Sequence, residues 1–90
     1  MIYKSKEGDI DLSSIVRLYP AAVIDMYGEI AEMSLEWMEM NEGKVKLVNY
    51  VLVFDSTPHG VEEKIRTVLK FDSRDELIEC MTEVSQFFQD

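Results

Sequence analysis

The stretch KVKLVNYVLVF, residues 44–54, decides the fold of this chain. Read as a β-strand, it places apolar side chains on both faces from residue 48 onward, with Asn49 as the only exception. One face would carry Val45, Leu47, Asn49, Val51 and Val53, and the other Val48, Tyr50, Leu52 and Phe54. Because a strand that is apolar on both sides is normally covered on both sides, we predict that it lies at the centre of a sheet.

Residues 61–71 alternate as a second strand with one buried face. One parity holds Val61, Ile65, Thr67, Leu69 and Phe71, and the other holds Glu62, Lys64, Arg66, Val68 and Lys70. The preceding residues 56–60, STPHG, are rich in turn formers. We therefore predict a loop that leads from the central strand into a flanking strand with one solvent-exposed face.

The segment SRDELIECMTEVSQFF, residues 73–88, predicts an amphipathic helix. Ser73, followed three residues later by Glu76, forms a capping box, in which each side chain bonds a free backbone N–H of the first turn. An apolar stripe at helical spacing is formed by Leu77, Met81, Val84 and Phe88. We expect this stripe to cover one face of the sheet.

Residues 21–41 can be read in two ways. As a helix, they would gather Asp25, Glu29, Glu32, Glu36 and Glu39 into one acidic stripe, and the sheet would have three strands. As strands, they alternate over residues 31–37 between two turns that end in glycine, at residues 25–28 and 40–43. We favour strands, because the central strand needs a neighbour on each side and a hairpin through residues 41–43 would supply one.

Two further strands are expected nearer the N-terminus. Residues 15–24 can form one, and Pro20 would confine it to a sheet edge or a bulge, because proline donates no ladder hydrogen bond. Residues 2–6 can form a short one that turns at residues 7–9. Together the elements predict an α+β fold, in which a curled antiparallel sheet of four to five strands precedes one C-terminal amphipathic helix. The length fits a single domain, residues 1–90.

The net charge of −9 is unevenly placed. Residues 18–43 hold six acids and residues 75–90 hold five, and neither stretch contains Lys or Arg. A negative field repels nucleic acid and anionic lipid, so we expect the chain to bind neither nucleic acid nor a membrane. The same field favours a basic protein partner, although acidic residues also serve solubility alone.

The single cysteine, Cys80, excludes a disulfide scaffold and suits a reducing compartment. No apolar stretch follows the charged residues at the N-terminus, so we expect no signal peptide. The longest apolar run, residues 50–54, is far shorter than the roughly 20 residues that a membrane helix needs. We therefore expect a cytoplasmic protein.

No motif indicates catalysis, a metal or a cofactor. His59 is the only histidine, whereas a zinc site needs three or four nitrogen or sulfur ligands. Residues 9–13 begin like a calcium loop, but Ser14 stands where glycine is required and Pro20 where the bidentate acid is required. We therefore expect a protein that is not an enzyme and that binds no cofactor.

Function is indicated by a surplus of apolar surface. Because one helix covers one face of a sheet, we expect the second face of the central strand to need another cover. Its residues are Val48, Tyr50, Leu52 and Phe54, with Met38 nearby. Either residues 10–24 fold over this face or the sheet curls, or the face binds a partner. We favour a non-enzymatic interaction module, a homodimer, that uses these five residues.

A second hypothesis is an inhibitor that mimics nucleic acid and captures a basic protein. Four regularly spaced acids would stand in for phosphates: Glu29, Glu32, Glu36 and Glu39. This hypothesis needs the four carboxylates to form one exposed row.

Overall fold

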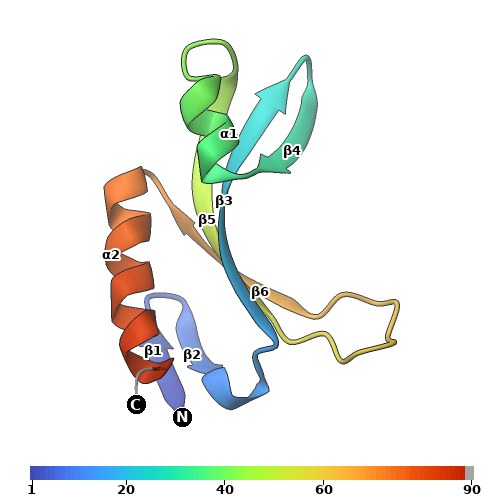
Figure 1. Cartoon of the computed structure of the whole chain (residues 1–90), viewed down its shortest axis with the longest axis vertical. Helices are drawn as coiled ribbons and strands as arrows, with labels where there is room; N and C mark the ends of the chain where they lie inside the picture. The colour runs from blue at the N-terminus through green and yellow to red at the C-terminus, as the bar shows by residue number, and fades with distance from the viewer. Residues whose placement is uncertain (89–90) are drawn as a thin grey trace.

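The computed structural model describes residues 1–88 and confirms an α+β fold with an antiparallel sheet (Figure 1). The sheet has four strands in the order β4-β3-β5-β6. Their bounds are β3 Arg17–Met26, β4 Glu29–Met33, β5 Lys46–Asp55 and β6 Arg66–Phe71. A separate two-stranded sheet pairs β1 (Ile2–Ser5) with β2 (Gly8–Asp11), and a 3-10 turn, η1 (Leu12–Ser14), follows it. The helix α2 (Arg74–Ser85) comes after β6 and continues into a 3-10 turn, η2 (Gln86–Phe88).

A β-bulge in β5 changes which residues share a face of the sheet. Asn49 lies opposite Val23 of β3, whereas Leu47 lies opposite Ile24, so Val48 is an extra residue between two ladder positions. Side chains alternate regularly only as far as this bulge. Leu47 therefore packs in the cluster of Ile24, and the prediction that it shares a face with Val51 and Val53 is wrong.

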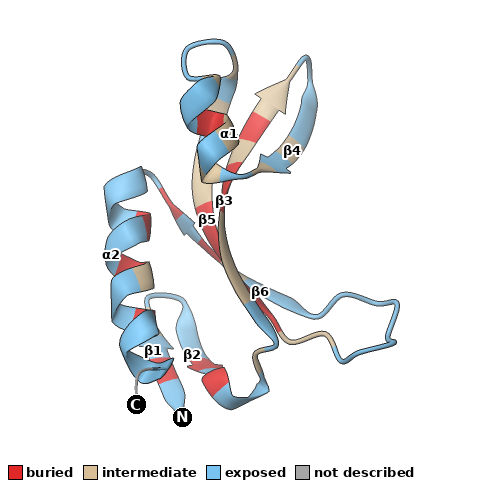
Figure 2. Cartoon of the chain, viewed as in Figure 1, coloured by how far each residue is buried: buried red, intermediate tan, exposed pale blue. Residues whose placement is uncertain are grey.

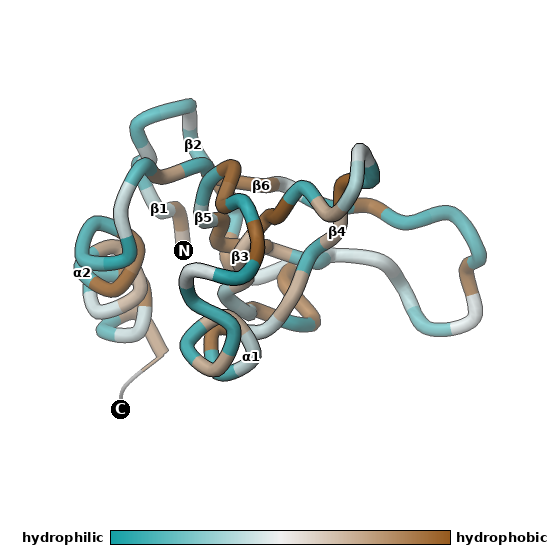
Figure 3. The backbone as a smooth tube through the Cα atoms, turned by 90° about the horizontal axis from the view of Figure 1, so that it is seen from above, coloured by the Kyte–Doolittle hydropathy of each residue, from teal (hydrophilic) through white to brown (hydrophobic). Residues whose placement is uncertain are grey.

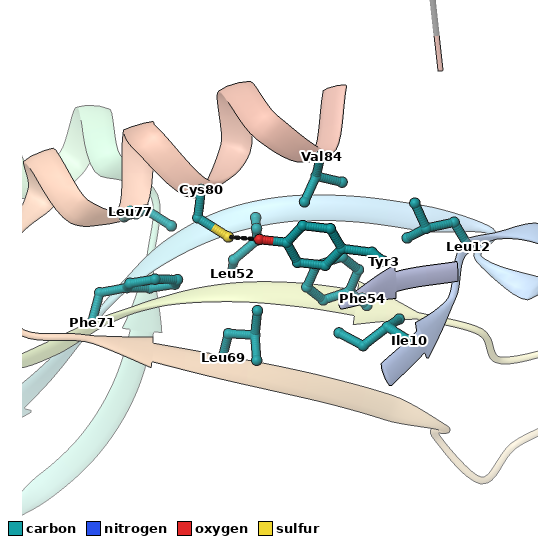
Figure 4. Close-up of a cluster of buried hydrophobic side chains, with 10 residues drawn as sticks. All are labelled: Tyr3, Ile10, Leu12, Leu52, Phe54, Leu69, Phe71, Leu77, Cys80 and Val84. Carbon is teal, nitrogen blue, oxygen red and sulfur yellow. Dashed lines mark hydrogen bonds between the residues drawn. The ribbon is translucent and has the colours of Figure 1, made fainter. Parts of the chain in front are cut away.

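The helix α2 and the N-terminal hairpin together cover one face of the sheet, which we call the helical face. Buried residues of β5 and β6 meet Leu77, Cys80 and Val84 of α2 (Figure 4). From the other side come three residues of the N-terminal segment: Tyr3, Ile10 and Leu12. The ring of Tyr3 stacks on Phe54 with a centroid distance of 6.4 Å.

The expectation that Leu52 and Phe54 lie on a face that α2 leaves bare is therefore wrong. Both side chains are fully buried, with exposed fractions of 0%, and Met38 is buried in the neighbouring cluster. The physical reason is the parity of β5, since its even-numbered residues from Tyr50 onward are the ones that face α2. Of the segment 10–24 that was an alternative cover, Ile10 and Leu12 pack on this face beside α2, whereas residues 17–24 belong to β3 of the sheet itself.

The middle segment contains both strands and a helix. The hairpin of β3 and β4 bears out the strand interpretation as far as Met33. There the strand ends, because the side chain of Ser34 caps a new helix, α1 (Leu35–Met40), by accepting a hydrogen bond from the backbone N–H of Trp37 at 3.1 Å. The predicted strand over residues 31–37 and the hairpin through residues 41–43 are wrong, and the neighbour of β5 on that side is β3.

Pro20 lies at a sheet edge, as its missing N–H predicts. It pairs with Leu52 of β5, while β4 pairs only with residues 22–26 of β3. Over its first half β3 is therefore unpaired on one side. The flanking strand β6 is shorter than predicted, because Val61 and Ile65 lie exposed in the loop of residues 56–65.

The helix α2 begins as its sequence predicts. Ser73 Oγ accepts a hydrogen bond from the backbone N–H of Glu76 at 3.2 Å, while the carboxylate of Glu76 accepts from the N–H of Asp72 at 3.3 Å, one residue before the usual capping-box partner. In the predicted stripe, Leu77 and Val84 are buried, Met81 is partly buried against the same cluster and Phe88 is half exposed. Cys80, outside the predicted stripe, is buried as well. Figure 2 shows that the buried residues of α2 lie on the side facing the sheet.

Replacing Ser73 by alanine is expected to lower the free energy of unfolding by about 1 kcal/mol, because the N–H of Glu76 loses its partner. Urea denaturation followed by circular dichroism measures the change. The matched control is Ser85→Ala at the exposed end of the same helix, which we expect to change stability by less than Ser73→Ala does. Equal effects of the two substitutions would contradict a capping role for Ser73.

Candidate interaction surface

The second face of the sheet, which we call the open face, carries an apolar cluster made of strand residues alone. Its members are Tyr19, Ala21, Val23, Val51, Val53 and Val68. The pairing register aligns them, because Tyr19 and Val68 both lie opposite Val53, and Ala21 lies opposite Val51. Seen from above, α2 lies on one side of the sheet, and the loop of residues 56–65 extends away from it on the other (Figure 3).

The sheet curls toward its open face, which accounts for the burial of Val51 and Val53 there without a covering helix. Their exposed fractions are 2% and 0%. Arg66 of β6 reaches Glu32 of β4 across this face, and its Nη2 donates to the two carboxylate oxygens at 2.8 and 3.0 Å. Because β4 and β6 are the two edge strands, the ion pair closes the curl that the sequence predicts.

Removing this ion pair with Glu32→Gln is expected to lower the free energy of unfolding by less than about 1 kcal/mol, because both side chains are partly exposed to solvent. The hydrogen bonds that Arg66 donates to Glu32 also raise the pKa of the Arg66 guanidinium. A double-mutant cycle with Arg66→Gln, run at low and at high salt, measures the coupling. We expect a small coupling that salt weakens. A coupling energy well above about 1 kcal/mol that salt does not change would contradict the description of this ion pair as exposed.

The open face continues to exposed apolar residues at one end of the sheet. Ile30 of β4 is 64% exposed, and Val48 at the bulge is 49% exposed. Beside them the side-chain oxygen Oδ1 of Asn49 is buried and accepts no hydrogen bond within the described chain. A buried acceptor without a hydrogen bond costs free energy. In the isolated chain this end of the open face therefore carries an unfavourable polar group beside exposed apolar side chains.

Charge on the open face is balanced although the chain is strongly acidic. By register, the face carries four bases and three acids: Arg17, Lys46, Arg66 and Lys70 against Asp25, Glu32 and Asp55. The two helices carry six acids and one base: Glu36, Glu39, Asp75, Glu76, Glu79 and Glu83 against Arg74. The negative charge is therefore concentrated on the helical side of the molecule.

The four acids of the nucleic-acid-mimic hypothesis come from two elements rather than one helix. Glu29 and Glu32 lie in β4, and Glu36 and Glu39 lie in α1. Glu32 pairs with Arg66, and Glu39 pairs with Arg74. Two of the four carboxylates are thus already matched by arginine, and no observation on this surface favours the mimic.

The five predicted interaction residues are not brought together on the surface. Leu52, Phe54 and Met38 are buried within the chain, Tyr50 is half-buried beside them, and Val48 alone is exposed. The residues of the open face were missed because the sequence did not show which face of β5 the helix α2 covers. A signal was present in Asn49, the one polar residue of the apolar run, which lies on the face of Val51 and Val53.

A cavity of about 240 Å³ lies at the other end of the open face, beneath the loop of residues 56–65. Its lining includes Arg17, Asp55, His59 and Lys64. Asp55 is buried, and its Oδ1 accepts a hydrogen bond from the backbone N–H of Thr57 at 2.8 Å. Hydrogen bonding from Thr57, by its side chain and then by its backbone, lowers the pKa of Asp55.

This lowered pKa predicts a pH dependence of stability. The ionised carboxylate of Asp55 is favoured in the folded chain, so its contribution is present above the ordinary aspartate pKa of about 3.9 and is lost as the pH falls through the lower folded value. Asp55→Asn is therefore expected to flatten the acid side of the stability curve. Thermal melts over a pH series measure this slope. An unchanged slope would contradict the role of Asp55.

The only cysteine lies in the core rather than in a reactive setting. The sulfur of Cys80 is 3.3 Å from the hydroxyl of Tyr3, which also donates to Glu83 at 3.1 Å. Burial raises the pKa of Tyr3, and the bonds to Cys80 and Glu83 raise it further. The arrangement anchors the N-terminal hairpin to α2.

Within residues 1–88, no group of three or more His, Cys, Asp or Glu side chains is placed to hold a metal ion. In that same range no helix combines the length and the apolar character needed to cross a membrane. Comparison with protein-family models, with curated proteins and with solved structures finds no match.

Proposed function

We propose that this chain is a non-enzymatic interaction module that associates with a second copy of itself through the open face. The observation that carries the proposal is an apolar sheet face that no helix of the described chain covers and on which Tyr19, Val23 and Val68 stay partly exposed, together with its balanced charge. Such a face is the kind of surface that oligomeric proteins bury. A cytoplasmic location is part of this proposal, because the unpaired Cys80 suits a reducing compartment.

The extended shape of the chain supports self-association, because the chain exposes more surface than a compact monomer of its size. Its radius of gyration is 14.0 Å, whereas a compact domain of this length has about 12 Å. Its accessible area is 6360 Å², whereas a monomer of this mass exposes about 5400 Å². The excess of roughly 1000 Å² is similar to the area of about 800 Å² that each partner contributes to a standard interface.

Charge favours a second copy over a basic protein on this face. A two-fold interface brings the same patch of both copies together, so the patch must complement itself. Mixed charges on the open face meet this requirement, whereas the acidic helices would repel one another. A basic protein would be drawn to the helical side instead.

Sedimentation velocity over a series of concentrations tests the proposal. We expect the mass to rise from 10.4 kDa toward twice that value between low micromolar and submillimolar concentration. A mass of one chain throughout the series would overturn self-association. If the mass rose only when a basic protein was added, the helical side rather than the open face would be the binding surface.

A further inference from the structure

Tyr27 is the most exposed aromatic residue of the described chain, and its backbone is strained. Its exposed fraction is 101%, and it stands at the tip of the hairpin between β3 and β4 with a φ of 54°. Because Gly28 also has a positive φ and Met26 pairs with Glu29, the turn has the form of a type I′ hairpin. That turn favours Asn, Asp or Gly at the first position, so a bulky tyrosine there is unfavourable for the isolated chain.

The cavity under the loop of residues 56–65 suits an aromatic ring. Its volume of about 240 Å³ exceeds the roughly 150 Å³ that accommodates benzene in an engineered protein cavity. Its lining combines the apolar side chains of Val16 and Val61 with the cations of Arg17 and Lys64. Val16 and Val61 are 62% and 44% exposed, and a cation beside an aromatic face is a favourable contact.

The strand β3 connects these two features. Arg17, at the start of β3, lines the cavity, and Tyr27 follows its last residue, Met26. A two-fold axis that lies between the two open faces, parallel to them and perpendicular to β3 near Ala21, places the start of one copy's strand opposite the end of the other's. Such an axis therefore brings each Tyr27 over the other copy's cavity.

The charges near the tip do not oppose this contact. Asp25, Lys44 and Lys46 line a cavity together with Tyr27, so two bases and one acid lie around the tyrosine. The acceptor cavity has Asp55 between its two cations. Neither end of the open face adds to the overall negative charge.

We propose that, in a dimer formed through the open face, Tyr27 of each copy occupies the loop cavity of the other copy. The inference rests on the proposed self-association and specifies how the two copies are joined. It accounts together for an exposed aromatic side chain, a strained turn and an unfilled cavity.

The substitution Tyr27→Asn separates the contact from the turn. Asparagine followed by Gly28 is a preferred type I′ pair, so the urea midpoint of the monomer is expected to rise. The dimer dissociation constant, measured by sedimentation, is expected to increase at least tenfold because the ring is lost. The matched control is Met40→Asn on α1, where an exposed apolar side chain on the helical side is removed, and it is expected to leave dimerisation unchanged.

Disulfide trapping tests the contact directly. In a Cys80→Ser background, Tyr27→Cys in one preparation is mixed with His59→Cys in another, and a linked pair of the two variants is expected under mild oxidation. Mixing Tyr27→Cys with Glu79→Cys on α2 is the control and should give no such pair. Linkage to residue 79 alone would overturn the inference.

The outcomes distinguish this inference from the proposed function. If the chain dimerises while Tyr27→Asn leaves the dissociation constant unchanged and no bond to residue 59 forms, the contact is wrong and self-association stands. If the unsubstituted chain is a monomer throughout, both are wrong.

Discussion

Replacing Phe54 by alanine is expected to lower the free energy of unfolding by about 3–5 kcal/mol, because a fully buried aromatic side chain leaves a cavity behind. Phe54 packs between the N-terminal hairpin and α2, in stacked contact with Tyr3. A domain of this size has little stability to lose, so much of the variant is expected to be unfolded at room temperature. Urea denaturation of the variant and the unsubstituted chain measures the difference.

Val48→Ala is the matched control, because Val48 belongs to the same strand and is half exposed. Val48→Ala should lower the free energy of unfolding far less than Phe54→Ala does. The comparison also separates the two roles that the sequence allowed for Phe54, a core residue covered by the chain or a residue of an interface. A variant that kept its monomer stability and lost only self-association would contradict the burial of Phe54 and would restore it to an interface.

Introducing a charge into the open face with Val68→Glu is expected to weaken self-association by at least 2 kcal/mol, roughly 30-fold in the dissociation constant, as for a residue at the centre of an interface. Val68 of β6 lies opposite Val53 of β5, and the side chain of Val68 remains partly accessible to solvent. A carboxylate there would have to lose its hydration when the two apolar clusters meet in the dimer. Sedimentation equilibrium measures the dissociation constant, and circular dichroism checks that the monomer is folded.

Ile78→Glu is the control for charge, because it adds the same carboxylate at an exposed position on α2. It is expected to leave the dissociation constant within a few-fold of the unsubstituted value. If the two substitutions weakened association equally, net charge would explain the effect. If only Ile78→Glu weakened it, the interface would lie on the helical side.

The elements that could be predicted from sequence are those whose signals are local. Ser73 and Glu76 identify the start of α2, and the glycines at residues 8 and 28 mark two turns that the structure contains. The antiparallel sheet was also predictable from alternation and from the apolar run of β5. In these cases the chain needs only its immediate neighbours to adopt the observed conformation.

The face of β5 on which Leu47 lies was not predictable, because a single bulge before Asn49 reverses the alternation on which the assignment depends. The extra residue, Val48, satisfies a register with Val23 and Ile24, which are more than 20 positions away in sequence. Nothing within residues 44–54 specifies that register. The misplaced interaction surface has a separate cause. Tyr50, Leu52 and Phe54 share one face as predicted, but α2 covers that face and not the face of Val51 and Val53.

The helix α1 was missed for a related reason. Residues 31–37 alternate like a strand, but Ser34 caps a helix that buries Met38 against Ala22 and Ile24 of β3. The alternation and the cap compete, and packing on β3 decides between them. The acidic residues of this segment were consequently divided between a strand and a helix instead of forming one row.

The central claim is that the open face is the surface through which two copies meet, and nuclear magnetic resonance tests it most directly. Amide and methyl spectra of the unsubstituted chain are compared at low and high concentration. We predict shifts confined to the open face, at Tyr19, Val23, Val51 and Val68, with α2 unchanged. Concentration-dependent shifts that map to α1 and α2, or spectra that do not change with concentration, would contradict it.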